Sequence, residues 1–131
     1  MILPTGATVA VVDGGKLLMF HNTGHETVKL SLLPTPVISG GGLSPGHRDS
    51  AGNPDNDSRG EDGFAAGVAA MLNAEALSGK LGDLVVIAAP RTLGELRKHW
   101  HKALETRLIG EIAKDLTGQS VDHIARAILH A

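Results

Sequence analysis

Residues 84–89 read LVVIAA, an unbroken apolar run bounded by Gly82-Asp83 and Pro90. A strand with one solvated face alternates apolar and polar residues, whereas a continuous apolar run is typical of a strand buried on both faces. Such a strand needs helices packed on its sheet. The run therefore predicts an α/β fold, and we expect it to form the central strand.

The first third of the chain predicts a three-stranded antiparallel meander. Residues 7–13 (ATVAVVD) end in Asp13-Gly14-Gly15, a strong hairpin turn signal, and residues 16–21 (KLLMFH) continue as the second strand. In residues 28–33, Val28, Leu30 and Leu32 alternate with polar residues, which indicates a third strand. Prolines at 34 and 36 then end it.

After residue 60 we expect three helices and, besides the strand over 84–89, one further strand. Glu61 and Asp62 mark the start of an amphipathic helix that runs toward Gly79. The remaining elements are a helix capped by Thr92 with Leu93, Leu96, Trp100 and Leu104 on one face, a strand over 109–116, and a helix opened by Ser120. The order predicts a single domain over 1–131, with a mixed five-stranded sheet and right-handed crossovers.

Residues 40–63 read GGGLSPGHRDSAGNPDNDSRGEDG and contain one bulky apolar residue, Leu43. Connections longer than about 12 to 15 residues are uncommon in small domains and are often functional. We therefore expect a flexible loop over about 39–63 and take His47, Arg48 and Arg59 as candidate binding residues. A phosphate loop is excluded, because His47 and Arg48 stand where that motif needs Lys and a hydroxyl.

Composition limits the remaining functions. The formal net charge is -2 and the chain has no cysteine, one tryptophan and two phenylalanines. It therefore offers no disulfide, no thiolate metal site and few aromatic side chains on which nucleic-acid bases could stack. No histidine pattern matches a metal motif. We expect a cytoplasmic protein that has no membrane segment and holds neither a metal nor a cofactor.

One segment is locally basic although the net charge of the whole chain is negative. Arg91, Arg97, Lys98, Lys102 and Arg107 outnumber the two carboxylates among them, Glu95 and Glu105. Two interpretations stay open at this point: a solvated helix face, or a contact for RNA phosphates or an acidic partner. The acidic loop could fold back on this patch.

Four segments together resemble a known family. VVDGGKLLMF, the Gly/Asp/Ser-rich loop, LVVIAAPRTLGELR and the late IAKDLTG resemble the bacterial host attachment proteins, described as required for attachment to host cells. The resemblance covers nearly the whole chain. That family is grouped with relatives of the central domain of class-one peptide-chain release factors, which has a ribonuclease-H-like sheet. The resemblance implies strand order 3-2-1-4-5 and association with RNA or the ribosome.

In release factors a loop after the meander carries Gly-Gly-Gln, which promotes peptidyl-tRNA hydrolysis. Here Gly40-Gly41-Gly42 is followed by Leu43, and the single Gln is Gln119, so that mechanism is not carried over. The positions that match the family include Asp13, Arg91, Gly94, Arg97, Lys114, Asp115 and Thr117. We expect Asp13 and Arg91 at the carboxyl ends of neighbouring strands, where open α/β sheets place their sites.

The sequence leaves three functions open. The first is a binding domain for RNA or the ribosome that uses Asp13, Arg91, Arg97, Lys98, Lys114, Asp115 and the loop residues. The second is a hydrolase that acts on an ester or phosphoester through His47 and acidic residues of the 39–63 loop. The third is a homo-oligomeric scaffold. A purely structural interpretation of the matched positions also stands, with an Arg91–Asp115 ion pair and Gly94 kept for close packing.

Overall fold

The computed structural model describes residues 1–36, 38 and 54–131, with the side chains of 54–59 excepted. The strands are β1 (Thr8–Val12), β2 (Leu17–Asn22), β3 (Leu30–Leu32), β4 (Leu84–Ala88) and β5 (Leu108–Ala113). The helices are α1 (Pro54–Leu77), α2 (Pro90–Arg97), α3 (Lys102–Glu105) and α4 (Val121–Leu129). The α/β class and the meander followed by helix crossovers are confirmed.

The strands form one five-stranded sheet in the order β3-β2-β1-β4-β5. β1 and β3 each pair antiparallel with β2, while β1–β4 and β4–β5 are parallel pairs. The mixed sheet and the order implied by the resemblance are therefore confirmed. The expectation that residues 84–89 form the central strand is wrong, because β1 lies in the middle of the sheet. β4 is nevertheless buried along its whole length, since it is internal and both of its faces are covered.

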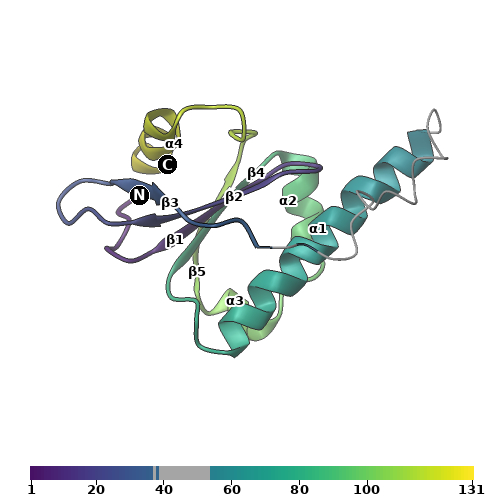
Figure 1. Ribbon diagram of the computed structural model, residues 1–131, viewed down its shortest axis with the longest axis horizontal. Helices are drawn as coiled ribbons and strands as arrows, with labels where there is room; N and C mark the ends of the chain where they lie inside the picture. The colour runs from purple at the N-terminus through teal and green to yellow at the C-terminus, as the bar shows by residue number, and fades with distance from the viewer. Residues whose placement is uncertain (37, 39–53) are drawn as a thin grey trace.

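Helices cover both faces of the sheet (Figure 1). On one face, α1, α2 and α3 pack against β1, β2 and β4 through a core that includes Met19, Phe64, Leu72, Val86 and Leu96. On the other face, α4 packs through a core that includes Val9, Val11, Ile87, Ile124 and Ile128. In the part of the chain that the structure describes, none of these helices combines the length and apolarity needed to cross a membrane.

α1 begins earlier than the sequence suggested. It starts at Pro54, so residues 54–63, expected to belong to the loop, are helical. Proline is tolerated in the first turn of a helix, while Gly60 and Gly63, which argued for a loop, lie inside it. Residues 37 and 39–53 lie outside the described part of the chain. The amino-terminal part of α1 extends past the sheet in Figure 1.

The helix expected from Thr92 to Leu104 is two helices. α2 begins at Pro90 with Ala89 as an N-cap that makes no side-chain hydrogen bond, so Thr92 is not the cap. Asn73 of α1 holds the break between α2 and α3. Its Nδ2 donates to the His99 carbonyl at 2.8 Å, and its Oδ1 accepts from the His101 amide at 2.9 Å.

The last two elements follow the sequence more closely. β5 ends at Ala113, and its register with β4 shifts between Leu84 and Val85, which explains why the apolar residues of this segment do not alternate cleanly. α4 begins after Ser120, whose side chain accepts a hydrogen bond from the His123 amide, as the pattern predicted.

Candidate functional site

The carboxyl ends of three parallel strands meet at one edge of the sheet, here called the carboxyl edge. Val12 lies opposite Ala88, and Ala88 lies opposite Ala113. The chain leaves these strands through Asp13 and Lys16, through Arg91, and through Lys114 and Asp115. The structure thus brings together four of the residues singled out from the sequence, and places Asp13 and Arg91 after neighbouring strands as expected.

Asp13 and Asp115 share one hydroxyl group. The Thr117 Oγ1 lies 2.9 Å from Asp13 Oδ2 and 2.9 Å from Asp115 Oδ1. The other oxygen of Asp13 accepts from the Gly15 amide at 2.9 Å, which closes the β1–β2 turn. Because a hydroxyl has one proton, it donates to one carboxylate at a time. Thr117 therefore joins the loop after β5 to the hairpin.

Arg91 contacts α1 rather than Asp115. Its Nη1 lies 2.8 Å from Glu61 Oε2 and its Nη2 lies 3.3 Å from Asp62 Oδ1. Glu61 also packs on Gly14 of the hairpin, where a Cβ atom would lie 2.8 Å from the Glu61 side chain. Hairpin, α1 and α2 thus meet around one guanidinium, and the Arg91–Asp115 ion pair of the structural interpretation is wrong.

Arg97 and Lys98 also have carboxylate partners. Arg97 Nε and Nη2 donate to Glu111 Oε1 at 3.1 and 3.0 Å, and these hydrogen bonds raise the pKa of the guanidinium. Lys98 Nζ lies 3.1 Å from Glu95, whose other oxygen contacts His99 at 3.0 Å. The hydrogen bond from His99, followed by that from Lys98, lowers the pKa of Glu95.

The basic segment consequently does not form one positive patch. Arg91 lies at the carboxyl edge, whereas Lys102 lies on α3 and Arg107 immediately precedes β5, toward the opposite edge. Among the described residues, Lys102 and Arg107 are exposed and make no ion pair, while the other three cations of the segment are paired. Local charge is therefore less positive than the sequence count suggests.

The structure says less about the other residues that the sequence singled out. His47 and Arg48 lie outside the described residues, and Arg59 lies on α1 in the part whose side chains are not described. Gly94 is not needed for close packing, because a Cβ atom there would meet no heavy atom within 4 Å. Within residues 1–36, 38 and 60–131, no three His, Asp or Glu side chains gather as metal ligands.

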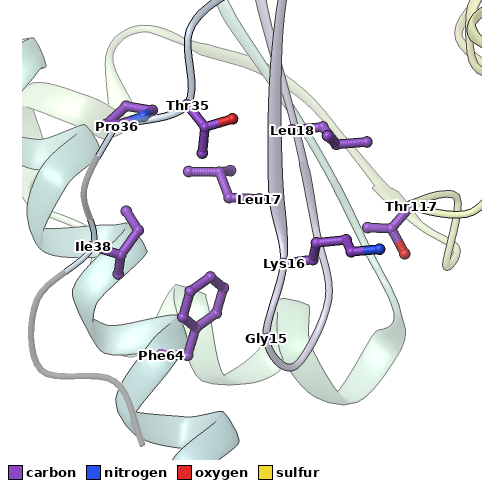
Figure 2. A pocket seen from close by; sticks show the side chains of 9 residues that line it. All are labelled: Gly15, Lys16, Leu17, Leu18, Thr35, Pro36, Ile38, Phe64 and Thr117. Carbon is purple, nitrogen blue, oxygen red and sulfur yellow. The ribbon is translucent and has the colours of Figure 1, made fainter. Parts of the chain in front are cut away.

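An open pocket of about 490 Å³ adjoins the carboxyl edge (Figure 2). Leu17, Ile38 and Phe64 give it an apolar wall, and Lys16, Thr35 and Thr117 supply the polar groups. Figure 2 shows the Lys16 side chain extending toward Thr117. The volume of the pocket is within the range of about 300–1,000 Å³ found for small-molecule sites. The pocket offers a ligand the Lys16 ammonium and the Thr35 hydroxyl, whereas the Thr117 hydroxyl already bonds to Asp13 or Asp115.

The sequence indicated most of the charged residues of the candidate site, but not which side chains contact one another. The sequence indicates Lys16 only as the start of a strand, and no motif singles out Glu111. Lys16 directly follows the Asp-Gly-Gly turn, which is the signal that could have placed it beside Asp13. Nothing in the local sequence connects Arg97 to Glu111, because that contact depends on how β5 lies against α2.

Comparison with known proteins gives the family. A search of curated proteins found no match. The family model described as "Bacterial archaeo-eukaryotic release factor family 12" matches residues 6–128, a span that includes every strand and nearly all of α4. The chain therefore belongs to bacterial archaeo-eukaryotic release factor family 12.

Proposed function

We propose that this protein is a binding domain of the translation apparatus that associates with the ribosome through RNA and does not catalyse peptide release. The observation that carries the proposal is the match to a release factor family over residues 6–128. The strand order β3-β2-β1-β4-β5 agrees with the sheet expected from that relation. Host attachment, the finer assignment made from the sequence, stays a prediction.

The absence of Gly-Gly-Gln supports a role without catalysis. The glycine triplet 40–42 is followed by leucine, and Gln119 lies between β5 and α4 rather than between β3 and α1. No peptide-release residue can therefore be assigned by position. The hydrolase alternative depends on His47, and no contact among the described residues favours it.

The carboxyl edge supplies cations for phosphate contacts. Lys16 and Lys114 are exposed and form no ion pair with any described residue. Lysine side chains at such positions contact nucleic-acid phosphates without reading sequence. Asp13 and Asp115 lie beside them and limit the positive potential, so we expect weak binding that is sensitive to salt.

Co-sedimentation with purified ribosomes over a salt series tests this proposal. Each lost phosphate contact lowers the slope of log affinity against log salt by about 0.7 to 0.9, so Lys16→Gln/Lys114→Gln should lower it by about 1.4 to 1.8. The matched control is Lys29→Gln/Lys80→Gln, which removes the same charge from exposed lysines away from the carboxyl edge. Absence of co-sedimentation at low salt would refute the proposal. An equal decrease of the salt slope in both variants would show that the carboxyl edge does not contact the ribosome.

A peptide-release assay tests the second half of the proposal. Ribosomes that carry labelled peptidyl-tRNA in the peptidyl site should release no more peptide with the protein than with buffer. A known release factor serves as the positive control. Release that depends on the protein would show that catalysis does not require the glutamine, and would overturn the non-catalytic role.

A further inference from the structure

Arg91 is the arginine that the described part of the chain places at the carboxyl edge, and the protein's own carboxylates occupy it. Its two terminal nitrogens each face a different acidic side chain, at 2.8 Å for Glu61 and 3.3 Å for Asp62. One positive charge thus meets two negative ones. The planar fork of arginine donors fits two phosphate oxygens in a similar way.

This ion-pair cluster is easily opened. The side chains of Arg91, Glu61 and Asp62 are 58%, 51% and 43% exposed, and exposed pairs of this kind contribute little to stability. From Gly60 onward, Phe64 is the first buried residue of α1. The side chains of Glu61 and Asp62 can therefore leave Arg91 without disturbing the core.

Gly14 makes room for Glu61 at this position. A Cβ atom on residue 14 would lie 2.8 Å from Glu61 Cγ, Cδ and Oε1. These atoms belong to the far part of a flexible side chain, so Gly14→Ala would push Glu61 away rather than break the hairpin. The glycine thus lets the carboxylate reach Arg91.

From these contacts we propose that Glu61 and Asp62 act as an internal mimic of phosphate, which masks Arg91 until an RNA backbone displaces them. The inference rests on the proposed function and deepens it, because it names Arg91 as an RNA contact and α1 as its competitor. Binding of RNA at Arg91 and pairing of Arg91 with α1 exclude one another. Removing the carboxylates should therefore strengthen RNA binding.

Fluorescence anisotropy with a labelled oligouridylate at low salt tests the competition. Breaking two exposed ion pairs corresponds to about a twofold to thirtyfold change in affinity, so Glu61→Gln/Asp62→Asn should bind RNA more tightly by this factor. Glu26→Gln/Asp122→Asn is the matched control, since it changes net charge equally at exposed carboxylates that form no ion pair within the described chain. Gly14→Ala should also strengthen binding although it leaves the net charge unchanged.

Arg91→Gln added to Glu61→Gln/Asp62→Asn should abolish the gain. The inference fails if the gain equals that of the charge-matched control, if it survives loss of Arg91, or if no variant changes RNA affinity. Tighter ribosome co-sedimentation with unchanged RNA affinity would assign Arg91 to an acidic protein surface and would likewise overturn the RNA inference. Wild-type co-sedimentation with ribosomes tests the proposed function separately, and thermal melting of each variant checks that it is folded.

Discussion

Asn22 should be the most sensitive polar position in the part of the chain that the structure describes. Among the described residues it is the one buried polar side chain, 2% exposed, and all of its hydrogen-bonding capacity is used. Its Nδ2 donates to the carbonyls of Leu3 and Pro4 at 3.0 and 3.2 Å. Its Oδ1 accepts from the amides of Gly24 and Lys29 at 3.0 and 2.9 Å. One side chain thus fixes both the amino-terminal turn and the loop between β2 and β3.

The cost of Asn22→Ala can be worked out from these four bonds. A typical intramolecular hydrogen bond contributes about 0.5 to 1.5 kcal/mol net, and a buried group left without a partner costs more. Three of the four bonds are only partly buried, so water can replace some of what is lost. We expect a loss of about 2 to 4 kcal/mol in the free energy of unfolding, a large share of the roughly 5 to 15 kcal/mol typical of a domain.

Equilibrium unfolding in urea measures this loss, and Thr23→Ala is the control. Thr23 is the next residue and makes one exposed side-chain hydrogen bond, to the Lys29 carbonyl at 3.2 Å, so its loss should cost less than about 1 kcal/mol. Asn22→Asp sharpens the test, because a carboxylate oxygen would face the Leu3 and Pro4 carbonyls that now accept from Nδ2. That variant should recover stability relative to wild type at acid pH, where the protonated acid can donate. An Asn22→Ala protein within 1 kcal/mol of wild type would refute the reasoning.

Two further predictions concern the region around α2. Asn73→Ala should speed hydrogen exchange of the amides between α2 and α3, since both bonds to His99 and His101 are lost; unchanged protection there would show that the break does not depend on Asn73. NMR titration should give Glu95 a pKa below the ordinary glutamate value, because His99 and Lys98 stabilise its carboxylate. The sign follows from the lowered pKa: the stabilisation is present above about pH 4.3, the unfolded value, and is lost as pH falls through the folded pKa. A normal Glu95 pKa, or a Glu95 pKa unchanged by Lys98→Gln/His99→Gln, would contradict the prediction.

Much of the fold follows from local patterns in the sequence. The Asp13-Gly14-Gly15 turn predicts the hairpin, the LVVIAA run predicts a doubly covered strand, and Ser120 with its apolar stripe predicts α4. Each of these signals is set by residues close together in the chain. The start of α1 and the division of α2 from α3 were not predicted, because a proline start and an asparagine on another helix decide them, whereas the end of α1 just before Gly79 agrees with the sequence.

The candidate site was predicted in position but not in its contacts. Parallel strands bring Asp13 and Arg91 to one edge whatever their side chains do, so topology alone sufficed for their placement. Arg91 pairs with Glu61 and Asp62 because α1 packs beside α2 in the folded protein. The local sequence does not reveal this packing of distant segments, which is why an equally reasonable pairing with Asp115 was wrong.

The central position of β1 has a consequence for how the chain folds. Its pairing with β2 is local, with Val12 opposite Leu17, whereas its pairing with β4 joins Thr8 to Leu84 across a segment that includes β2, β3 and the whole of α1. Closing so long a segment costs entropy before any contact is gained, which slows formation of non-local pairs. We therefore expect the hairpin to form first during synthesis and to present the unpaired edge of β1 until β4 has been made. Such an edge is where we expect nascent chains to associate wrongly, and it stays unpaired while the whole of α1 is synthesised, because α1 precedes β4 in the chain.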